Sequence, residues 1–529
     1  MADIEFPRGS VRAPNHLVAS ADHLATSAGV EMYQRGGNAA DAAIATNAVM
    51  TVVGPQLCGM GGDLFALVHL DGEVHALNSS GRAASGSDAD QLRSEGHTVM
   101  PYRLDIRSVT VPGCVDGWLA LHGRFGSLPL ETILEPARRL AADGFPASPS
   151  LTSAVSFLDD SSKANLLELA GQVTHTGSRV RRPGVAGALA SIAGRGREGF
   201  YGGAFGQGLL ALGHGLFAES DLSTPSADWV APLSTEAFGV ELHTTPPNSQ
   251  GYLTLGGARL ATAHGVPRAP HDERWAHVLI EAALAAGRDR PDVLSDTADG
   301  DALLASIDER LDEIDPERAS RSTVSTADGD TTYLCTVGTG SDGERMAVSL
   351  IQSNAAGFGS HLVEPSTQIN LHNPGMGFSL EEGHPAELVP GRRPPHTLCP
   401  AVATDEDGLR GVFGTMGGDA QPQILLQVAA RLFHHRQSPA RAINAGRWRL
   451  TGGQTGFDTW TSRSDPRVLV EAHAPDDWVD ALHARGHRTA QAPAFDSGFG
   501  HAHAIVADRD GMLAGAADPR TRVGSAAGG

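Results

Sequence analysis

Short apolar segments occur in pairs along the chain, and four of these pairs are joined by a turn that contains Asp-Gly. Asp-Gly supplies the positive φ angles that a tight hairpin turn requires, so each pair predicts two antiparallel strands. One predicted hairpin lies near the start of the chain and three lie after residue 330. The pairs are residues 64–70 with 74–77, 333–337 with 347–352, 401–403 with 409–413, and 502–506 with 512–514.

Helix boundaries are marked at other places. Residues 21–34 form a predicted helix that Gly36 and Gly37 end, and Asn38 caps a second, alanine-rich helix that runs to about residue 52. Hairpins at both ends of the chain, with helices between them, predict stacked antiparallel sheets covered by helices, so the expected fold class is α+β. The other predicted helices are residues 118–122, 130–142, 275–286 and 423–433.

The composition is that of a compact globular protein, with 41% hydrophobic and 19% charged residues. Its 529 residues alone suggest three or four domains, at about 150 residues each. The formal net charge of −21 argues against a nucleic-acid partner, because a phosphate backbone would be repelled. The first 14 residues lack the pattern of a secretory signal and no run of about 18 apolar residues occurs, so we expect a cytoplasmic protein without a membrane span.

The cysteines and histidines do not indicate a metal site. Cys58, Cys114, Cys335 and Cys399 are widely separated and form no Cys-x-x-Cys pair, so they are expected to be buried thiols. The segment His501-Ala502-His503 would place two rings on one face of a strand, but no third ligand lies at a telling spacing. No metal is therefore expected.

Thr331 is the candidate nucleophile, at the head of the predicted strand 333–337. The motifs of serine hydrolases, zinc proteases and P-loop proteins do not occur. The preceding segment, residues 288–330, is polar and acidic, and its last part lacks apolar periodicity, so we expect it to be mobile. Cleavage before Thr331 would give the hydroxyl a base in its own α-amine, whose reference pKa is about 7.7–8.0. On the residues alone, an ordinary strand beginning Thr-Thr is the simpler interpretation.

Motifs along the whole chain favour the catalytic interpretation. Residues 36–43, Gly-Gly-Asn-Ala-Ala-Asp-Ala-Ala, and residues 59–63, Gly-Met-Gly-Gly-Asp, resemble the opening signature of the gamma-glutamyltransferase family. The matches follow the family order from about residue 20 to 520, and their details resemble a cytoplasmic branch related to cephalosporin acylases. The further matching blocks are residues 111–113, 117–118, 125–126, 128–130, 144–146, 221–222, 229–230, 232–233, 246–251, 414–423 and 517–520.

This resemblance implies a four-layer αββα sandwich of the N-terminal nucleophile hydrolase type. The chain would be made as a precursor and cut between Asp330 and Thr331. Residues 1–330 would then be the large subunit and residues 331–529 the small subunit, together forming one sandwich domain. Thr331 would be the attacking group both in this cleavage and in turnover.

The resemblance also assigns roles to other residues. By position, Ser353 matches the hydroxyl beside the nucleophile, and Gly417 and Gly418 match the pair whose backbone amides form the oxyanion hole. Preorganised donors are what a tetrahedral oxyanion needs, and glycine lets the backbone approach closely. Arg82 falls where the family carries the arginine that pairs with the substrate carboxylate.

The sequence departs from the family where the substrate amine is held. Gly377 stands where the family has an aspartate, and His396-Thr397 stand where a pair of serines is usual. Glutamyl specificity is therefore in question, whereas the nucleophile and the oxyanion hole are retained. The residues next to the glycine pair that we expect to replace the lost polar contacts are Asp419, Gln421 and Gln423.

We therefore expect an amide-bond enzyme that forms an acyl ester on Thr331 and passes the acyl group to water or an amine, without a cofactor. The expected substrate is a small gamma-glutamyl amide such as glutathione. An acylase for cephalosporin or other N-acyl amides is the first alternative, and an unprocessed protein that binds amino-acid-like ligands is the second. The expected partners are this small molecule and the two subunits of one precursor, and the sequence leaves a higher oligomer open.

Overall fold

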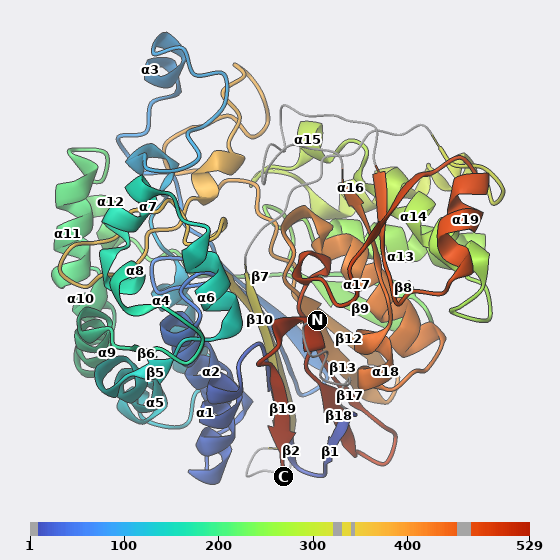
Figure 1. The fold of residues 1–529 in the computed structure, drawn as a ribbon, viewed down its shortest axis with the longest axis horizontal. Helices are drawn as coiled ribbons and strands as arrows, with labels where there is room; N and C mark the ends of the chain where they lie inside the picture. The colour runs from blue at the N-terminus through green and yellow to red at the C-terminus, as the bar shows by residue number, and fades with distance from the viewer. Residues whose placement is uncertain (1–8, 321–330, 340–343, 452–466) are drawn as a thin grey trace.

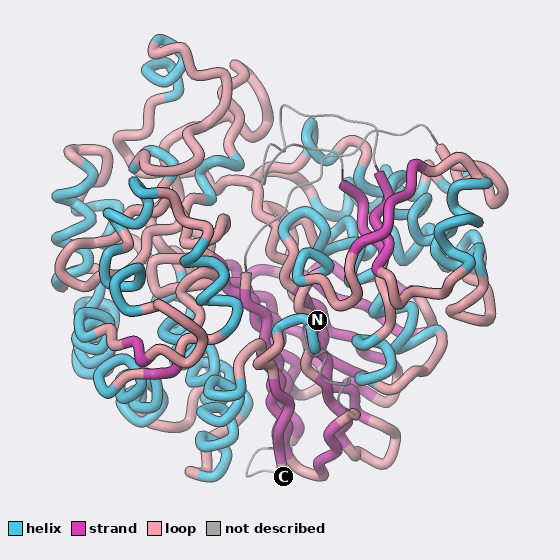
Figure 2. Tube along the Cα trace, viewed as in Figure 1, coloured by secondary structure: helices cyan, strands magenta, loops and turns pink. Residues whose placement is uncertain are grey.

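The computed structural model describes residues 9–320, 331–339, 344–451 and 467–529. Two large antiparallel sheets lie face to face in the middle of the molecule, and helices cover the outer face of each (Figure 1). Figure 2 shows the same arrangement, with the strands gathered between two helical layers. The predicted α+β class and the four-layer αββα sandwich are confirmed, and one stack of layers replaces the three or four domains that length suggests.

The first sheet has seven strands and holds the candidate nucleophile at one strand end. Strands from before and after residue 330 pair with one another in it, so neither part of the chain completes the sheet alone. In spatial order the strands are β19 (Ser525–Gly528), β2 (His16–Ser20), β10 (Thr332–Thr339), β11 (Arg345–Ser353), β3 (Asp63–Leu70), β4 (Glu73–Ser79) and β7 (Asp228–Val230).

The second large sheet also has seven strands drawn from both parts of the chain. In spatial order they are β1 (Val11–Ala13), β18 (Leu513–Ala516), β17 (Ala502–Ala507), β13 (Gly408–Thr415), β12 (Ala401–Asp405), β9 (Val240–Thr244) and β8 (Leu233–Ala237). Two small sheets lie outside this sandwich and are formed by β14 (Trp448–Thr451), β15 (Arg467–Glu471) and β16 (Arg488–Ala492), and by β5 (Phe145–Pro146) and β6 (Arg179–Val180).

Strand β10 shows how the alternation of side chains builds the layers. Tyr333 and Cys335 point between the two sheets, where they join a core with residues of the second sheet. Leu334 points the other way and packs beneath the first helical layer. Successive side chains of a strand face opposite sides, and both faces of β10 are covered, so its residues are buried from Thr332 to Gly338. The threonine Thr336 lies on the same face as Leu334, and its hydroxyl donates to the carbonyl of Ala39.

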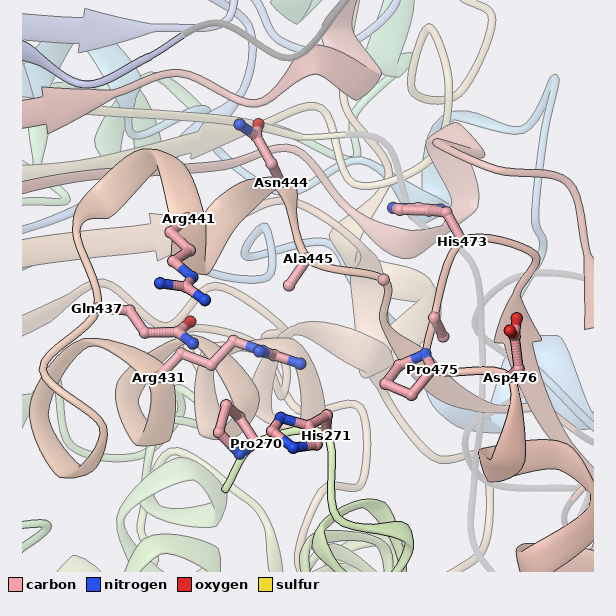
Figure 3. A pocket seen from close by; sticks show the side chains of 12 residues that line it. Pro270, His271, Arg431, Gln437, Arg441, Asn444, Ala445, His473, Pro475 and Asp476 are labelled. Carbon is pink, nitrogen blue, oxygen red and sulfur yellow. The ribbon is translucent and has the colours of Figure 1, made fainter. Parts of the chain in front are cut away.

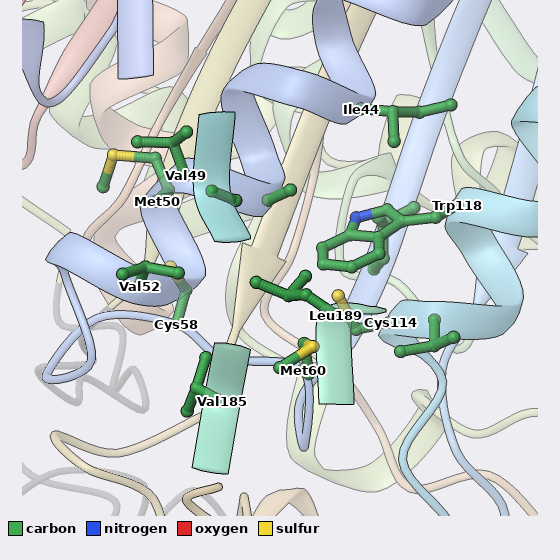
Figure 4. Close-up of a cluster of buried hydrophobic side chains, with 14 of the residues drawn as sticks. Ile44, Val49, Met50, Val52, Cys58, Met60, Cys114, Trp118, Val185 and Leu189 are labelled. Atoms are coloured by element: carbon green, nitrogen blue, oxygen red, sulfur yellow. The ribbon is translucent and has the colours of Figure 1, made fainter. Parts of the chain in front are cut away.

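The first helical layer is built around the alanine-rich helix α2 (Ala39–Val53), which is buried along its whole length. Asn38 and Asp41 form a reciprocal capping box at its start. Figure 4 shows the core that α2 shares with its neighbours, including Trp118 and Leu189. The other helices of this layer are α1 (His23–Gln34), α4 (Cys114–Phe125), α5 (Leu130–Asp143), α6 (Pro149–Ser156), α7 (Asp160–Asn165), α8 (Leu167–Gln172), α9 (Pro183–Arg195), α10 (Arg197–Phe200), α11 (Ala204–Gly213) and α12 (Glu219–Ser223). The short helix α3 (Ala89–Ser94) stands apart from this layer, and its Ala89 and Leu92 pack in a separate small core.

The second helical layer covers the other sheet. Helix α17 (Gln421–Ala429) begins directly after the Gly417-Gly418 turn and continues into a wider turn, Ala430–His434. The remaining helices of this layer are α13 (Tyr252–His264), α14 (Glu273–Gly287), α15 (Arg290–Val293), α16 (Gly300–Asp308), α18 (Pro439–Asn444) and α19 (Asp477–Ala484).

All four predicted hairpins are present, in antiparallel register. The turn of the second one, residues 340–343, lies outside the described residues. The polar segment 288–330 is more structured than we expected, because α15 and α16 lie within it and Leu304 and Ile307 pack into the core. Two apolar side chains one turn apart suffice to anchor a short helix. The polar composition of the segment as a whole made this short apolar pattern hard to recognise in the sequence. Residues 321–330, where mobility and cleavage are expected, are outside the described part of the chain.

Candidate functional site

Thr331 and Ser353 lie opposite each other at the ends of two paired strands. Thr332 at the start of β10 pairs with Gln352, which places Thr331 beside Ser353 at the end of β11. Thr331 Oγ1 donates a hydrogen bond to Ser353 Oγ at 3.1 Å, and the N–H of Ala355 donates to the same oxygen at 2.8 Å. Both hydroxyl residues are buried. The threonine hydroxyl is thus held in a fixed direction by a hydroxyl that is itself fixed by the backbone.

A buried carboxylate stands on the next strand. Asp63, the first residue of β3, pairs with Ser353 in the sheet. Its carboxylate accepts hydrogen bonds from the N–H of Gly81 at 2.8 Å and from Nε2 of His396 at 3.2 Å, and Nδ1 of His372 lies 3.6 Å away. Burial raises the pKa of Asp63, but His372, His396 and the Gly81 N–H outweigh it and hold that pKa below its usual value. The site therefore contains a carboxylate that stays ionised.

Sequence reasoning did not assign Asp63 a role, although it quoted the block 59–63. The alternation of β3 hides it, because Asp63 looks like the polar start of an apolar strand. His396 was noted only as a departure from the family pattern. The structure joins the two, so a residue of the first sheet and a residue of the loop before β12 form one buried pair. Their proximity is a property of the three-dimensional fold, since they lie 333 positions apart in the sequence.

Gly417 and Gly418 form the turn between β13 and α17, with φ angles of 137° and 55°. Both angles are positive, which explains glycine at each position. Among the described residues, neither amide N–H donates a hydrogen bond within the protein. Two adjacent, unengaged N–H groups are what an oxyanion hole requires. The turn follows Gly414, whose backbone lies against the ring of Tyr333, two residues after Thr331.

Gln250 anchors this turn through hydrogen bonds from its side-chain amide. Its Nε2 donates to the carbonyl of Gly418 at 3.0 Å and to the carbonyl of Thr397 at 2.9 Å. Gln250 is fully buried and belongs to the block 246–251, which the sequence identified without a role. The Gly418 peptide is therefore fixed through its carbonyl, which leaves the preceding N–H groups free to face a ligand.

Arg82 lies at the edge of the site, next to the Gly81 N–H that binds Asp63. Its guanidinium contacts Asp228 at 3.0 Å and donates to the carbonyl of Gly391 at 3.2 Å, and 37% of its side chain is exposed. Arg393 contacts the same Asp228 oxygen at 2.8 Å. Two guanidinium groups thus share the Asp228 carboxylate, and a second carboxylate, Asp296, accepts from the backbone N–H of Arg393 at 3.0 Å. Burial and the neighbouring Arg82 lower the pKa of Arg393.

The three residues expected to replace the lost polar contacts are all buried and have partners in the protein. Asp419 forms a buried ion pair with Arg290 at 3.1 Å, beside a cavity of about 30 Å³. The Oε1 atoms of Gln421 and Gln423 accept from backbone N–H groups, of Cys399 at 3.3 Å and of Leu450 at 2.8 Å. These contacts position the start of α17. A direct role of the three side chains toward substrate stays a prediction.

Gly377 ends a short 3₁₀ turn, Pro374–Gly377, and is buried. A Cβ at this position would lie 2.8 Å from the carbonyl oxygen of Pro395, closer than real Cβ atoms come. The backbone thus leaves no room for the aspartate that the family carries here. The other half of the expected cleavage site, Asp330, lies outside the described residues.

The residues near Thr331 do not include a cluster of metal ligands among those described. His503 Nδ1 accepts from the N–H of Asp518, and His501 Nε2 shares a hydrogen bond with Ser497. One described group, His277, Glu281 and His487, brings three candidate ligand atoms together away from the site. Its two histidine nitrogens are 2.8 Å apart, which is direct hydrogen-bond distance. In the described part of the chain, no helix is long and apolar enough to cross a bilayer.

Comparison with known proteins agrees with this geometry. The chain is 32% identical over 527 residues to the Glutathione hydrolase-like YwrD proenzyme of Bacillus subtilis (strain 168), covering 97% of this chain and 98% of that one. It is 33% identical to the Oxamate amidohydrolase proenzyme of Klebsiella pneumoniae subsp. pneumoniae, covering 97% and 98%.

Solved structures and a family model extend the comparison. The crystal structure of cephalosporin acylase from Bacillus halodurans superimposes with a TM-score of 0.89 at 32% identity, covering 100% of this chain and 98% of that one. The model of the family described as Gamma-glutamyltranspeptidase matches residues 25–528. With its αββα sandwich of the N-terminal nucleophile hydrolase type and its acylase relatives, the chain is an enzyme that belongs to the gamma-glutamyltranspeptidase family.

Proposed function

We propose that the chain is a precursor that cuts itself between Asp330 and Thr331 and then hydrolyses or transfers an acyl group through Thr331. The observation that carries the proposal is the 3.1 Å hydrogen bond between the buried hydroxyls of Thr331 and Ser353 at the head of β10. A hydroxyl held in this way, directly after the expected cleavage point, is positioned for attack on a carbonyl.

In processing, the Thr331 hydroxyl attacks the carbonyl of Asp330 and the acyl group moves from nitrogen to oxygen. This shift breaks the peptide bond and frees the α-amine of Thr331. Water then cleaves the ester, which frees the carboxylate of Asp330 and restores the Thr331 hydroxyl. The products are residues 1–330 and 331–529. They stay together because each large sheet contains strands of both parts that pair with one another.

In turnover, the freed α-amine accepts the hydroxyl proton as Thr331 attacks the substrate amide. The N–H groups of Gly417 and Gly418 stabilise the tetrahedral oxyanion. The amine then gives its proton to the departing nitrogen, and the acyl group remains as an ester on Thr331. Water or an acceptor amine then attacks this ester. Attack by water makes the enzyme a hydrolase, and attack by an amine makes it an acyltransferase.

For the acyl donor we propose a small amide with a free carboxylate, of which a gamma-glutamyl amide such as glutathione is the first candidate. The guanidinium groups of Arg82, which is partly exposed, and of Arg393 support the carboxylate. The relatives named as a glutathione hydrolase-like proenzyme and an oxamate amidohydrolase proenzyme also support an acidic acyl group. We also propose that Asp419, Gln421 and Gln423, beside the Gly417-Gly418 turn, shape the part of the site that receives the substrate.

A second candidate function is that of an acylase for N-acyl side chains without an α-amine. Gly377 favours it, because the backbone there cannot carry the carboxylate that would hold a substrate ammonium. Gamma-glutamyl and glutaryl p-nitroanilides differ only in that amine. Faster release of nitroaniline from the first supports glutamyl specificity, and faster release from the second supports the acylase.

Electrophoresis under denaturing conditions tests the processing step. Two fragments with masses that sum to 55.0 kDa, the smaller beginning at Thr331 by mass spectrometry, are expected. A single intact chain that still turns over either anilide would overturn the proposal. An intact chain without turnover that binds amino-acid-like ligands would leave the pseudoenzyme alternative.

A cytoplasmic location is also proposed, because all four cysteines are buried free thiols.

A further inference from the structure

A second pocket, of about 640 Å³, lies on the second helical layer and shares no residue with the site of Thr331. Its walls come from residues 270–271, from the turn Ala430–His434 after α17, from α18 and from the loop after β15 (Figure 3). Its volume falls in the range of small-molecule pockets, about 300–1,000 Å³. Nothing in the proposed reaction uses it.

Arg431 is the unusual residue of this pocket. Only 6% of it is exposed, and its guanidinium stacks on the ring of Trp275 at 4.6 Å from the ring centre. In the described part of the chain, its side chain makes neither an ion pair nor a hydrogen bond. Burial and the positive charges of Arg447 and Arg441 lower its pKa to about 10. Arg431 is therefore still a cation near neutral pH, without a counter-charge.

The other side chains on the same wall are suited to an anion. Figure 3 shows Arg441 and Gln437 gathered with Arg431 on one side of the pocket, and Asp476 on the other. Burial lowers the pKa of His473, so this imidazole is neutral near pH 7 and remains a hydrogen-bonding group. The cationic wall thus contains two arginines, and the carboxylate of the pocket lies away from it.

A buried cation is normally paired, because removing an ion from water is unfavourable unless an opposite charge or hydrogen bonds replace the water. Arg431 has the Trp275 ring on its face and lines the pocket, and no described residue supplies an opposite charge, so a bound anion would supply the partner that the described structure lacks. A guanidinium presents a planar fork of N–H groups that matches carboxylate and phosphate oxygens. The protein's net charge of −21 would repel anions elsewhere, which makes a local cationic pocket selective.

We propose that this pocket binds a small oxyanion, a carboxylate or a phosphate group, with Arg431 as the buried anchor and Arg441 as the second cation. Arg431 binds the oxyanion through its N–H fork while Trp275 keeps the guanidinium plane fixed. Arg441 is exposed at the rim, where its guanidinium adds a second positive charge to the same wall. Asp476, on the far wall, places a limit on the total negative charge that the ligand can carry.

Isothermal titration calorimetry of the full-length protein with inorganic phosphate and, separately, with succinate tests this site. Wild type is expected to bind at least one of them at one site per chain. Arg431→Gln is expected to weaken that binding at least tenfold. Arg436→Gln is the matched control, because Arg436 is exposed in the same connection, does not line the pocket and carries the same charge. It is expected to bind as wild type does.

The two anions separate the sources of the ligand. Binding of phosphate alone indicates a phosphate or phosphorylated ligand, and binding of succinate alone indicates an organic acid. If Arg431→Gln does not fold, Arg441→Gln at the exposed rim replaces it, with at least threefold weaker binding expected. No binding by wild type, or equal binding by wild type and both pocket variants, would overturn the proposal.

Discussion

The hydroxyl of Thr331 donates its hydrogen bond to Ser353 across the first position beyond the β10–β11 pairing, 3.1 Å from oxygen to oxygen. The sheet register therefore sets the direction of the candidate nucleophile. A second strand pair continues this geometry, since Asp63 of β3 pairs with Ser353 in turn. Three strand ends thus meet in one buried layer, and each contributes one polar side chain.

Ser353→Ala is expected to lower kcat of the mature enzyme by about 10- to 100-fold, because the Thr331 hydroxyl loses the acceptor that orients it. Fragment formation should slow as well. Thr332→Val is the matched control, because the neighbouring Thr332 hydroxyl is buried without a hydrogen-bond partner in the described structure. Steady-state kinetics and the melting temperature of both variants check the prediction, which fails if the two are equally active.

Gln250→Ala is expected to lower kcat with little change in KM. Gln250 fixes the Gly418 carbonyl, so its loss lets the turn move and weakens the oxyanion hole without touching substrate. A role confined to folding would lower the amount of soluble enzyme and leave kcat per active site unchanged. Titration of active sites, followed by kinetics, distinguishes the two. Gln91→Ala, on the exposed face of α3, serves as the control.

Asp63 is expected to make the protein sensitive to acid. Its folded pKa lies below the unfolded value, so the carboxylate contributes stability above about pH 4, and this contribution is lost as the pH falls through the folded pKa. Asp63→Asn removes both the contribution and its pH dependence. At pH 7 we expect a loss of about 2 kcal/mol or more in the free energy of unfolding. Urea unfolding of both proteins at pH 7 and pH 3 should show the difference shrinking in acid.

Glu281 is expected to have the opposite pH dependence. Burial raises its pKa to about 7, so the stability it contributes is fully present below its unfolded pKa of about 4.3 and is lost as the pH rises through 7. His487, 3.7 Å away, has a pKa lowered to about 3 and changes stability in the other direction. Glu281→Gln isolates the first effect, because His487 is common to both proteins.

The variant should therefore gain stability relative to wild type between pH 5 and pH 8, by at most about 3 kcal/mol. Thermal unfolding at several pH values measures this gap. If the difference in stability between Glu281→Gln and wild type stays constant or shrinks as the pH rises, Glu281 is not the buried group that takes up a proton.

The hairpins were predictable because they depend on local chemistry, and Asp71-Gly72 needs only the turn geometry of its own residues. Ser353 and the glycines at 417 and 418 were assigned by their positions in motifs that resemble those of the family. What the sequence could not provide is contact across layers. Gln250 reaches Gly418 over 168 positions, and His396 reaches Asp63 over 333. Helix α16 was missed for another reason, since its two core side chains are diluted among acidic neighbours.

Gly377→Asp tests whether the departure from the family pattern can be reversed by one substitution. The Cβ of any side chain there would lie 2.8 Å from the Pro395 carbonyl oxygen, so the loop between Gly377 and Pro395 must move before a carboxylate fits. The backbone, and not only the side chain, has therefore diverged. We expect a lower melting temperature and no gain in the rate on gamma-glutamyl relative to glutaryl p-nitroanilide. Gly383→Asp controls for a glycine lost from a loop: a Cβ there meets nothing within 4 Å, although Gly383, unlike Gly377, has a positive φ of 77° that adds backbone strain. A stable Gly377→Asp enzyme with a higher ratio of gamma-glutamyl to glutaryl turnover would show instead that specificity depends on this side chain alone.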